Sequence, residues 1–352
     1  MASGKKGLNR PAIILVLLIL LLISVILAMG MGAVPIPAVE TIHILGEMLP
    51  FVGRLLTPGP VPIAPSHHTI VTQLRLPRVL LAVLVGSSLA VSGATFQGLF
   101  KNPMADPYII GVSAGAALGG TMALALSLRF YFFGIGAVPF FAFFGAVFAM
   151  ILVYNLARVG ERVPVMSLLL AGIAVGSVLQ ALVSLVTYFS ESELQKIVFW
   201  LMGSLSGRGW DYFYLALPYA IVSMFIVWIF ARDLNVFLLG EEPAQLLGIE
   251  VEKTKKYLLW AASMLTAVAV ATSGLIGFVG LVVPHVVRLL FGPDHRVLLP
   301  AAALSGAIFL VWVDTLARIL LPPLEIPVGL LTALVGGPFF LYLLRKRNHT
   351  LY

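Results

Sequence analysis

Long apolar stretches, separated by short polar ones, run through most of this 352-residue chain. A helix needs about 20 apolar residues to cross the hydrocarbon core of a bilayer. Ten stretches come close to that length, and we expect them at residues 11–33, 79–100, 107–128, 135–157, 165–189, 212–231, 257–273, 276–292, 298–317 and 328–344. The pattern predicts an all-α polytopic membrane protein with ten transmembrane helices, forming a single transmembrane domain over residues 1–352.

Two connections between these stretches are longer than a turn. Residues 34–74 include the proline-rich sequence TPGPVPIAPSHH, and we expect an outer loop that is irregular or carries a short interfacial helix. Residues 233–256 form the other long connection, in which GEEP resembles a helix start because acids and a proline favour the first turn. Gly248 marks the end of that helix. The second loop is therefore predicted to hold two short helices joined by a glycine.

Composition and charge place the chain in a membrane and give it an orientation. Hydrophobic residues make up 60% of the chain and charged residues only 11%, against roughly 25% charged in a soluble domain. The net charge of +7 is spread over the ends of apolar stretches, so we expect contact with lipid and no nucleic acid. With cytoplasmic termini, 15 of the 22 Lys and Arg residues lie inside. The positive-inside rule therefore predicts a multi-pass cell-membrane protein with both termini cytoplasmic, from a bacterium or an archaeon.

Small residues recur every four positions on both sides of a polar turn at residues 101–107. They are Gly86, Ala90, Ala94 and Gly98 before the turn, Gly111, Gly115 and Gly119 after it, and later Gly172 and Gly176. Such stripes let helix backbones approach closely in lipid, where no hydrophobic force draws helices together. Two interpretations stay open: static packing, or close packing around a route through the bundle with the polar turn at its inner mouth.

Several kinds of chemistry are missing from the sequence. It has no cysteine, no G-x-x-x-x-G-K-[ST] phosphate loop and no H-E-x-x-H motif, so we expect no metal site, no cofactor and no catalytic centre. No acidic cluster sits in the middle of a predicted span, although carriers driven by ion gradients usually need one. A secondary transporter and an intramembrane enzyme are therefore the weaker alternatives to a passive permease. The histidines at 67 and 68 could contact a metal or haem iron, or could simply be solvated.

Six sequence motifs resemble the permease family of ABC importers for cobalamin, ferric siderophores and haem, and together they run from about residue 70 to the C-terminus. They are LRLPRVLLAVLVGSSLAVSGATFQGLFKNPMADPYIIGVSAGAALGG, LLLAGIAVGSVL, VFWLMGSLSG, GEEPAQLLGIEV, ATSGLIGFVGLVVPHVVRLLFGPDHRVLLPAAALSGA and LEIPVGLLTALVGGPFFLYLL. The resemblance implies a type II importer fold with ten spans per subunit. It also implies a homodimer with a pathway along its axis, two ATPase subunits that bind ATP and Mg²⁺, and an extracytoplasmic substrate-binding protein.

The same resemblance implies roles for particular residues. Asn102 and Met104 match the cytoplasmic gate turn of the family, and Val165 and Met166 match a second gate element, where a polar pair of the cobalamin permeases is replaced by apolar residues. Residues implied to contact the ATPase are Glu241, Ala244, Leu247 and Gly248. Residues implied to receive acidic side chains of the binding protein are Arg75, Arg78 and Arg318.

Two further points depend on the residues themselves. Arg75 and Arg78 could equally be anchors for lipid headgroups, because arginines near span ends often extend to the interface. Asp314 and Arg318 are one helical turn apart and are predicted to pair. The substrate stays open between a siderophore, haem, cobalamin and an oxyanion, since specificity in this family lies mainly with the binding protein.

Overall fold

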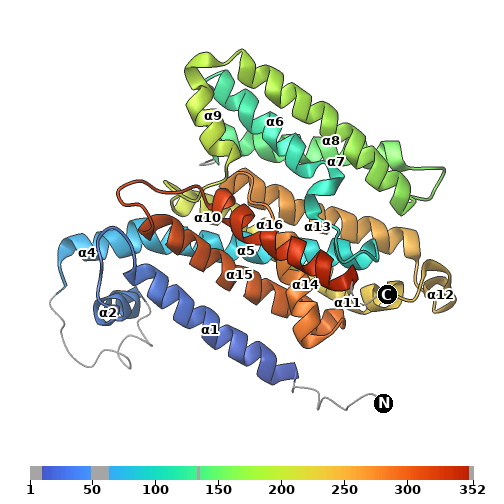
Figure 1. Ribbon diagram of the computed structural model, residues 1–352, viewed down its shortest axis with the longest axis horizontal. Helices are drawn as coiled ribbons and strands as arrows, with labels where there is room; N and C mark the ends of the chain where they lie inside the picture. Colours follow the sequence, from blue (N-terminus) through green and yellow to red (C-terminus); the bar gives the residue numbers. More distant parts are fainter. Residues whose placement is uncertain (1–9, 49–62, 133–134, 349–352) are drawn as a thin grey trace.

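The computed structural model describes residues 10–48, 63–132 and 135–348, and helices make up almost all of its regular structure (Figure 1). Among these described residues, seven helices are long and apolar enough to cross a membrane: α1 (Arg10–Gly30), the continuous run Pro65–Leu99, α7 (Ala137–Ala157), α8 (Val165–Tyr188), α10 (Trp210–Ile229), α13 (Val251–Ser273) and α15 (His295–Ile319). Three shorter apolar helices are α6 (Val112–Ala125), α14 (Val279–Phe291) and α16 (Val328–Asn348). The predicted all-α membrane fold is confirmed, while the count of ten crossings stays a prediction.

The remaining elements are short. They are α2 (Ala38–Met48), the 3-10 turns η2 (Pro107–Ile110) and η3 (Glu191–Glu193), α9 (Leu194–Leu201), α11 (Ala231–Phe237), α12 (Glu241–Leu246) and the paired strands β1 (Tyr131–Phe132) and β2 (Ile135–Gly136). In the loop predicted at 233–256, α11 and α12 are separated by Gly240, as expected, and Gly248 follows the end of α12.

Two predicted boundaries were wrong for local reasons. The second span was expected to start at residue 79, but α4 (Pro65–Thr69), the π-helix η1 (Ile70–Arg75) and α5 (Leu76–Leu99) form one run. Proline is compatible with a first helical turn, so Pro65 begins this run. The third span was expected to start at 107, yet Gly111 has a φ of +79° and separates η2 from α6. The predicted outer loop 34–74 thus ends in helix and also carries α2, while its residues 49–62 lie outside the described residues.

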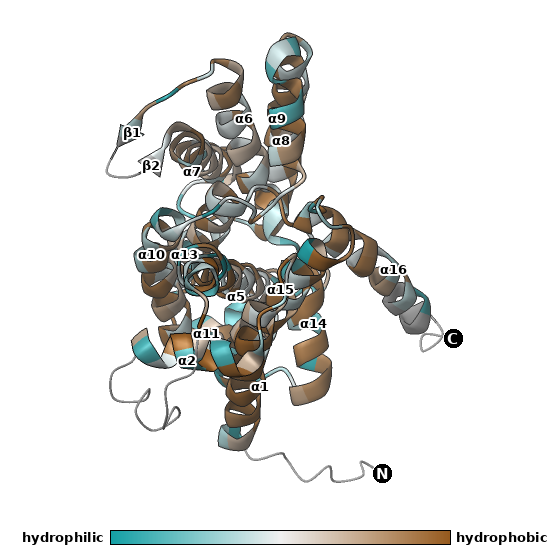
Figure 2. Cartoon of the chain, turned by 90° about the vertical axis from the view of Figure 1, so that its left-hand side faces the viewer, coloured by the Kyte–Doolittle hydropathy of each residue, from teal (hydrophilic) through white to brown (hydrophobic). Residues whose placement is uncertain are grey.

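Helix α5 forms the centre of the bundle and is buried along nearly its whole length. It packs against α10, α13, α14 and α15, whereas α6, α7 and α8 form a second layer beside it (Figure 1). The outer surfaces of the bundle are apolar: Leu15, Leu18 and Leu22 of α1 and Leu289 and Leu290 of α14 are all exposed. Figure 2 shows this hydrophobic colour along α1 and α14. Such surfaces suit contact with lipid.

The predicted glycine stripes bring helix backbones into direct contact. A Cβ atom added at Gly86 would overlap the carbonyl of Gly306 on α15, and one added at Gly115 would overlap the carbonyl of Gly145 on α7. Because only glycine lacks this atom, these positions allow the backbones to approach as closely as they do. Close packing at Gly86 and Gly115 fits both interpretations of the stripes, so the choice between static packing and packing around a route stays open.

Ion pairs and hydrogen bonds show which helix termini share an end of the bundle. Arg10 at the start of α1 pairs with Asp294 at the start of α15, with 3.0 Å between Nη2 and Oδ2. This end also carries α12, the 100–106 turn and the start of α8 (Figure 1), and we refer to it as the α12 end. At the opposite end, Arg75 donates to the carbonyl of Met29 at the end of α1. This is the Arg78 end, named after the arginine at its centre.

Replacing Gly86 with alanine should lower the melting temperature of the detergent-solubilised protein, because the added methyl group would overlap the Gly306 carbonyl. Overpacking of this kind costs about 1–3 kcal/mol, which exceeds the roughly 0.5–1 kcal/mol gained by removing a helical glycine. Gly176→Ala is the matched control, since its Cβ would meet nothing nearer than 4.0 Å. Equal melting temperatures for the two variants would contradict the close approach of α5 and α15.

Candidate functional site

The polar turn at residues 100–106 is a preformed structure at the α12 end. Asn102 Oδ1 accepts a hydrogen bond of 3.0 Å from the backbone N–H of Met104, which closes the turn around Pro103. Asp106 Oδ1 accepts from the N–H of Tyr108 at 2.8 Å and so caps η2. Asn102 is exposed and Met104 is partly exposed. The two predicted gate residues therefore lie at the surface, on a turn whose shape is set by its own side chains.

Buried polar contacts tie both sides of this turn to α14 and the segment before it. Gln97, near the end of α5, donates to the carbonyl of Leu281 at 3.0 Å and accepts from Arg288 at 2.9 Å. The Tyr108 hydroxyl donates to the carbonyl of Ile276 at 2.9 Å and accepts from its N–H at 3.1 Å. The roles of Gln97 and Tyr108 were not predicted, because a single polar residue in an apolar stretch gives no sign of its distant partner.

The second predicted gate element is the first turn of α8. Val165 is partly buried and Met166 is 67% exposed. In the described part of the chain, no hydrogen bond or ion pair joins these residues to Asn102 or Met104. Whether the two elements form one gate therefore stays a prediction.

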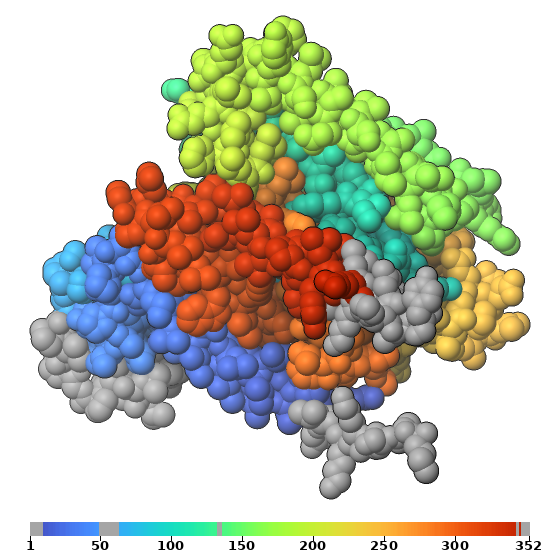
Figure 3. Space-filling model, in the orientation of Figure 1, coloured from blue at the N-terminus to red at the C-terminus, as the bar shows by residue number. Residues whose placement is uncertain are grey.

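A shallow groove of about 570 Å³ runs between α8 and η2. Its polar lining comes from Ser177, Gln180 and Ser184, which share one face of α8 because they are three and seven residues apart. The Ser177 and Ser184 hydroxyls donate to carbonyls one turn back, at 2.9 and 3.1 Å, whereas the exposed Gln180 amide finds no partner among the described residues. Figure 3 shows a recess beneath α8, between it and α16.

This face of α8 is unsuited to lipid. An amide group without hydrogen bonds costs several kcal/mol in hydrocarbon, on the order of 2–7 kcal/mol. The face therefore needs water or another protein surface next to it. The sequence analysis did not single out these three residues, although their spacing within the predicted span 165–189 was a readable signal.

Helix α12 exposes leucines at the α12 end. Leu246 is 88% exposed and Leu247 is 66% exposed, and Gly248 next to them is exposed too. Glu241 is partly exposed, but Ala244 is fully buried against the rest of the chain. Ala244, one of the four residues predicted to contact an ATPase, is thus turned toward the rest of the chain and holds α12 in place. Leu246, which the prediction omitted, presents the largest apolar surface.

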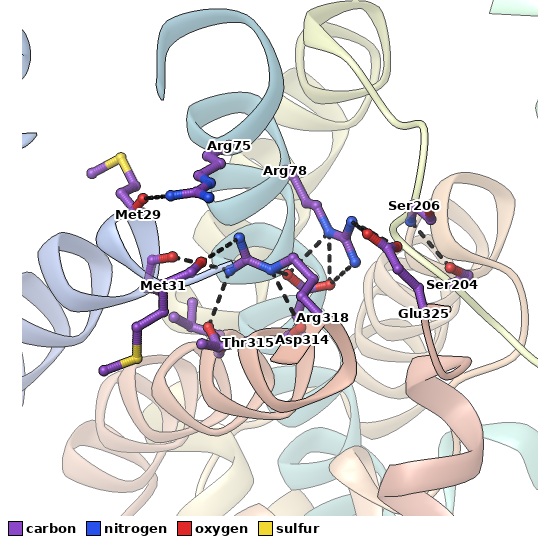
Figure 4. A network of polar contacts seen from close by, with 12 residues as sticks. Met29, Met31, Arg75, Arg78, Ser204, Ser206, Asp314, Thr315, Arg318 and Glu325 are labelled. Atoms are coloured by element: carbon purple, nitrogen blue, oxygen red, sulfur yellow. Dashed lines mark hydrogen bonds and ion pairs between the residues drawn. The ribbon is translucent and has the colours of Figure 1, made fainter. Parts of the chain in front are cut away.

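At the Arg78 end, two buried arginines hold the end of α1. Arg75 donates to the carbonyls of Met29 and Gly30 at 2.7 and 3.2 Å, and also to that of Val34. Arg318 donates to the carbonyls of Ala28 and Met31 at 3.1 and 3.2 Å (Figure 4). The last carbonyls of a helix lack intrahelical partners and carry partial negative charge, so guanidinium groups stabilise them.

A buried ionic network continues from this contact. Arg78 donates to Asp314 at 2.9 and 3.1 Å and to Glu325 at 3.0 and 2.9 Å (Figure 4). Arg318 lies 3.3 Å from the Asp314 carboxylate, which confirms the predicted pair. Burial alone would raise the pKa of Glu325, yet the Arg78 guanidinium holds this pKa below its ordinary value.

The placement of these arginines limits the docking role predicted for them. Arg75, Arg78 and Arg318 are each less than 9% exposed. Docking an acidic partner through them requires their present contacts to break. No partner chain is present, so the docking role stays a prediction, and their observed role is to join α1, α5 and α15.

His67 and His68, expected in a loop, lie on the short helix α4 and face α2. His67 Nδ1 is 2.7 Å from the Glu40 carboxylate, and His68 Nε2 is 3.8 Å from that of Glu47. Within residues 10–48, 63–132 and 135–348, no three His, Cys, Asp or Glu side chains gather as metal ligands would. These contacts favour a structural role for His67.

Comparison with known proteins identifies the family. The sequence profile of the FecCD transport family matches residues 20–346. The chain belongs to this family. It is 46% identical to the cobalamin import system permease protein BtuC of Halobacterium salinarum over 324 residues, covering 90% of this chain and 86% of that protein. It is 44% identical to the hemin transport system permease protein HmuU of Yersinia pestis, covering 78% and 83% of the two chains.

A solved structure agrees with this assignment. A metal-chelate type ABC transporter in an inward-facing conformation superposes with a TM-score of 0.82 at 33% identity, covering 96% of this chain and 99% of that one. The predicted resemblance to ABC importer permeases is confirmed. This FecCD family chain is therefore an integral membrane protein of a transport family.

Substituting Asp314 with asparagine should destabilise this FecCD family protein by about 3–5 kcal/mol, because it leaves Arg78 and Arg318 buried beside a neutral group. Glu325→Gln is the matched control. The Glu325 side chain is 36% exposed, so water compensates for part of the loss and we expect a cost of about 1 kcal/mol. Thermal unfolding in detergent measures both. Equal losses would show that Asp314 is not the anion on which the network depends.

Proposed function

We propose that this chain is the transmembrane permease subunit of an ATP-driven importer that moves a metal chelate into the cytoplasm. The observation that carries the proposal is the fold match to a metal-chelate type ABC transporter over 96% of the chain. Relatives named for cobalamin and hemin transport support cobalamin or haem as the substrate, and a ferric siderophore is the third metal chelate that we propose. The permease itself is no enzyme and holds no cofactor, since ATP and Mg²⁺ are bound by a partner ATPase.

The second copy of this chain is the partner that we assign to the α8 face. The Gln180 amide, which has no partner among the described residues, and the serines beside it need water or protein next to them. In a homodimer the α8 faces of the two copies would face each other across a water-filled pathway along the dimer axis. The substrate would pass along the groove at α8 and leave between the turns at Asn102 and Met104 and at Val165 and Met166.

Two ATPase subunits are the partners that we assign to α12. The exposed Leu246 and Leu247 lie outside the apolar spans, where a large unpaired apolar side chain is best buried by another protein. The α12 end would then face the cytoplasm, in agreement with the excess of Lys and Arg there and with cytoplasmic termini. The Arg78 end would face the substrate-binding protein, for which Arg75, Arg78 and Arg318 remain the proposed contacts.

Transport then consists of shifts between packed states. ATP binding and hydrolysis change the separation of the ATPases, and α12 moves with the ATPase surface that binds it. The two gate elements move with α12 if the ATPase binds the open and closed states of the permease with different affinity. A partner shifts the equilibrium between two states only through such a difference.

Proteoliposomes that contain this chain, its ATPase and its binding protein should import the ligand of the binding protein only when ATP is supplied. Radiolabelled cyanocobalamin, haem and a ferric hydroxamate siderophore are the ligands to compare, and a non-hydrolysable ATP analogue is the control. Uptake at the same rate without nucleotide would reject the proposal. Uptake that follows an imposed ion gradient would support a secondary transporter instead.

Serine at both Leu246 and Leu247 should weaken binding of the ATPase to the permease at least tenfold, because the exposed apolar surface of α12 is lost. Affinity is measured with the purified ATPase on permease in nanodiscs. Leu324→Ser is the matched control and should leave the affinity unchanged, since Leu324 is 73% exposed and lies next to Glu325, the partner of Arg78. Equal affinities for the two variants would exclude α12 as the main contact.

A further inference from the structure

A buried lysine at the α12 end contacts three separate segments at once. Lys255, in the first turns of α13, is only 6% exposed. Its Nζ lies 2.7 Å from a carboxylate oxygen of Glu252 on the same helix and 3.2 and 3.3 Å from the two oxygens of Glu241 on α12. It also donates to the backbone carbonyl of Val163 at 3.3 Å. An ammonium group has three hydrogen-bond donors, so these contacts use all of them.

The third segment leads directly into α8. Val163 is 5% exposed, and both of its backbone polar groups are bound by α13. Its N–H donates to Glu252 at 3.0 Å, and its carbonyl accepts from Lys255. Val163 lies only two residues before Val165, where α8 begins. Two charged side chains on α13 therefore hold the backbone just before the first turn of α8.

The Glu241–Lys255 contact matters because α12 is joined to the rest of the chain through a glycine on each side. Glycines border this short helix on both sides, Gly240 with a φ of +131° and Gly248 with a φ of +83°. Glycine takes up such angles without steric cost, so the chain can turn at both joints. The buried Ala244 packs beneath α12, and the ion pair between Glu241 and Lys255 joins α12 to α13.

We propose that Lys255 is a positioning residue that transmits displacement of α12 to the first turn of α8. A buried charge that loses a partner costs far more than an exposed one. When Glu241 moves with α12, Lys255 keeps its contact by moving with it, and the Val163 carbonyl follows. This inference rests on the proposed function, because it assigns a route between the proposed ATPase contact and the proposed second gate element.

Neighbouring lysines on the same helix lack this arrangement. Lys253 is exposed and pairs with Glu250 beside it on the surface. Lys256 is exposed as well, and the structure shows no ion pair for it among the described residues. Lys256 therefore provides a matched control of the same residue type, one position further along α13.

The test measures ligand imported per ATP hydrolysed in proteoliposomes of the complete complex. Lys255→Met should retain ATP hydrolysis within about twofold of the unmodified complex while import per ATP falls at least fivefold. Lys255→Arg should restore most of the coupling, because a guanidinium also offers several donors to the same carboxylates and carbonyl. Lys256→Met should match the unmodified complex. A lysine with a merely structural role would lower the amount of assembled complex and leave this ratio unchanged.

Glu241→Gln covers the case in which Lys255→Met does not assemble. It removes only the charge of Glu241 and leaves the contacts of Lys255 with Glu252 and Val163 in place. Its control is Glu242→Gln, which removes the charge of the exposed neighbour on the same helix. Import per ATP should fall at least threefold in Glu241→Gln alone. Equal ratios for the assembled Lys255→Met and Lys256→Met, or for the two glutamate variants, would overturn the role of Lys255. Failure of the unmodified complex to import with ATP would instead reject the proposed function.

Discussion

A charged side chain that has been removed from water must keep its partners, and this requirement shapes both ends of the bundle. At the Arg78 end, Arg78 and Arg318 share the carboxylate of Asp314, which is 1% exposed. At the α12 end, Lys255 holds two glutamates and a backbone carbonyl. Removing a buried partner such as Asp314 would leave an uncompensated charge in a poorly solvated place, at a cost of about 3–5 kcal/mol, so these contacts hold the segments in one arrangement.

The middle of the bundle is held by another means. Glycines of α5 and α15 bring the two backbones together, and beside them Ser87 of α5 donates to the carbonyl of Ala303 on α15 at 2.9 Å. The result is a tightly packed centre with ionic connections at its ends. Two surfaces are nevertheless incomplete within one chain: the polar face of α8 around Gln180 and the exposed leucines of α12. These are the surfaces where the proposed second copy and the proposed ATPase complete the assembly.

The arginines at the Arg78 end show how residue identity and residue role can separate. Three arginines match the family pattern, and the pattern implies that they receive acidic residues from another protein. In the structure, the acids and carbonyls that they bind belong to this chain, and none of the three is more than 8% exposed. A motif records which residue stands at a position, whereas burial and contacts with distant residues decide what that residue is free to do.

The apolar pattern by itself determined the class of the protein and the approximate places of its main helices, and the local signals at GEEP and Gly248 predicted the short helix α12. Each of these features depends on residues that are close together in the sequence, so the local sequence pattern is enough to predict it. The glycine stripes were readable for the same reason, because helical spacing places them on one face. Only the tertiary structure decided the partners of those stripes and the charged networks. Arg78 meets Asp314 across 236 residues of sequence, and Lys255 meets Val163 across 92. No local pattern records such pairings, since they depend on how whole helices pack.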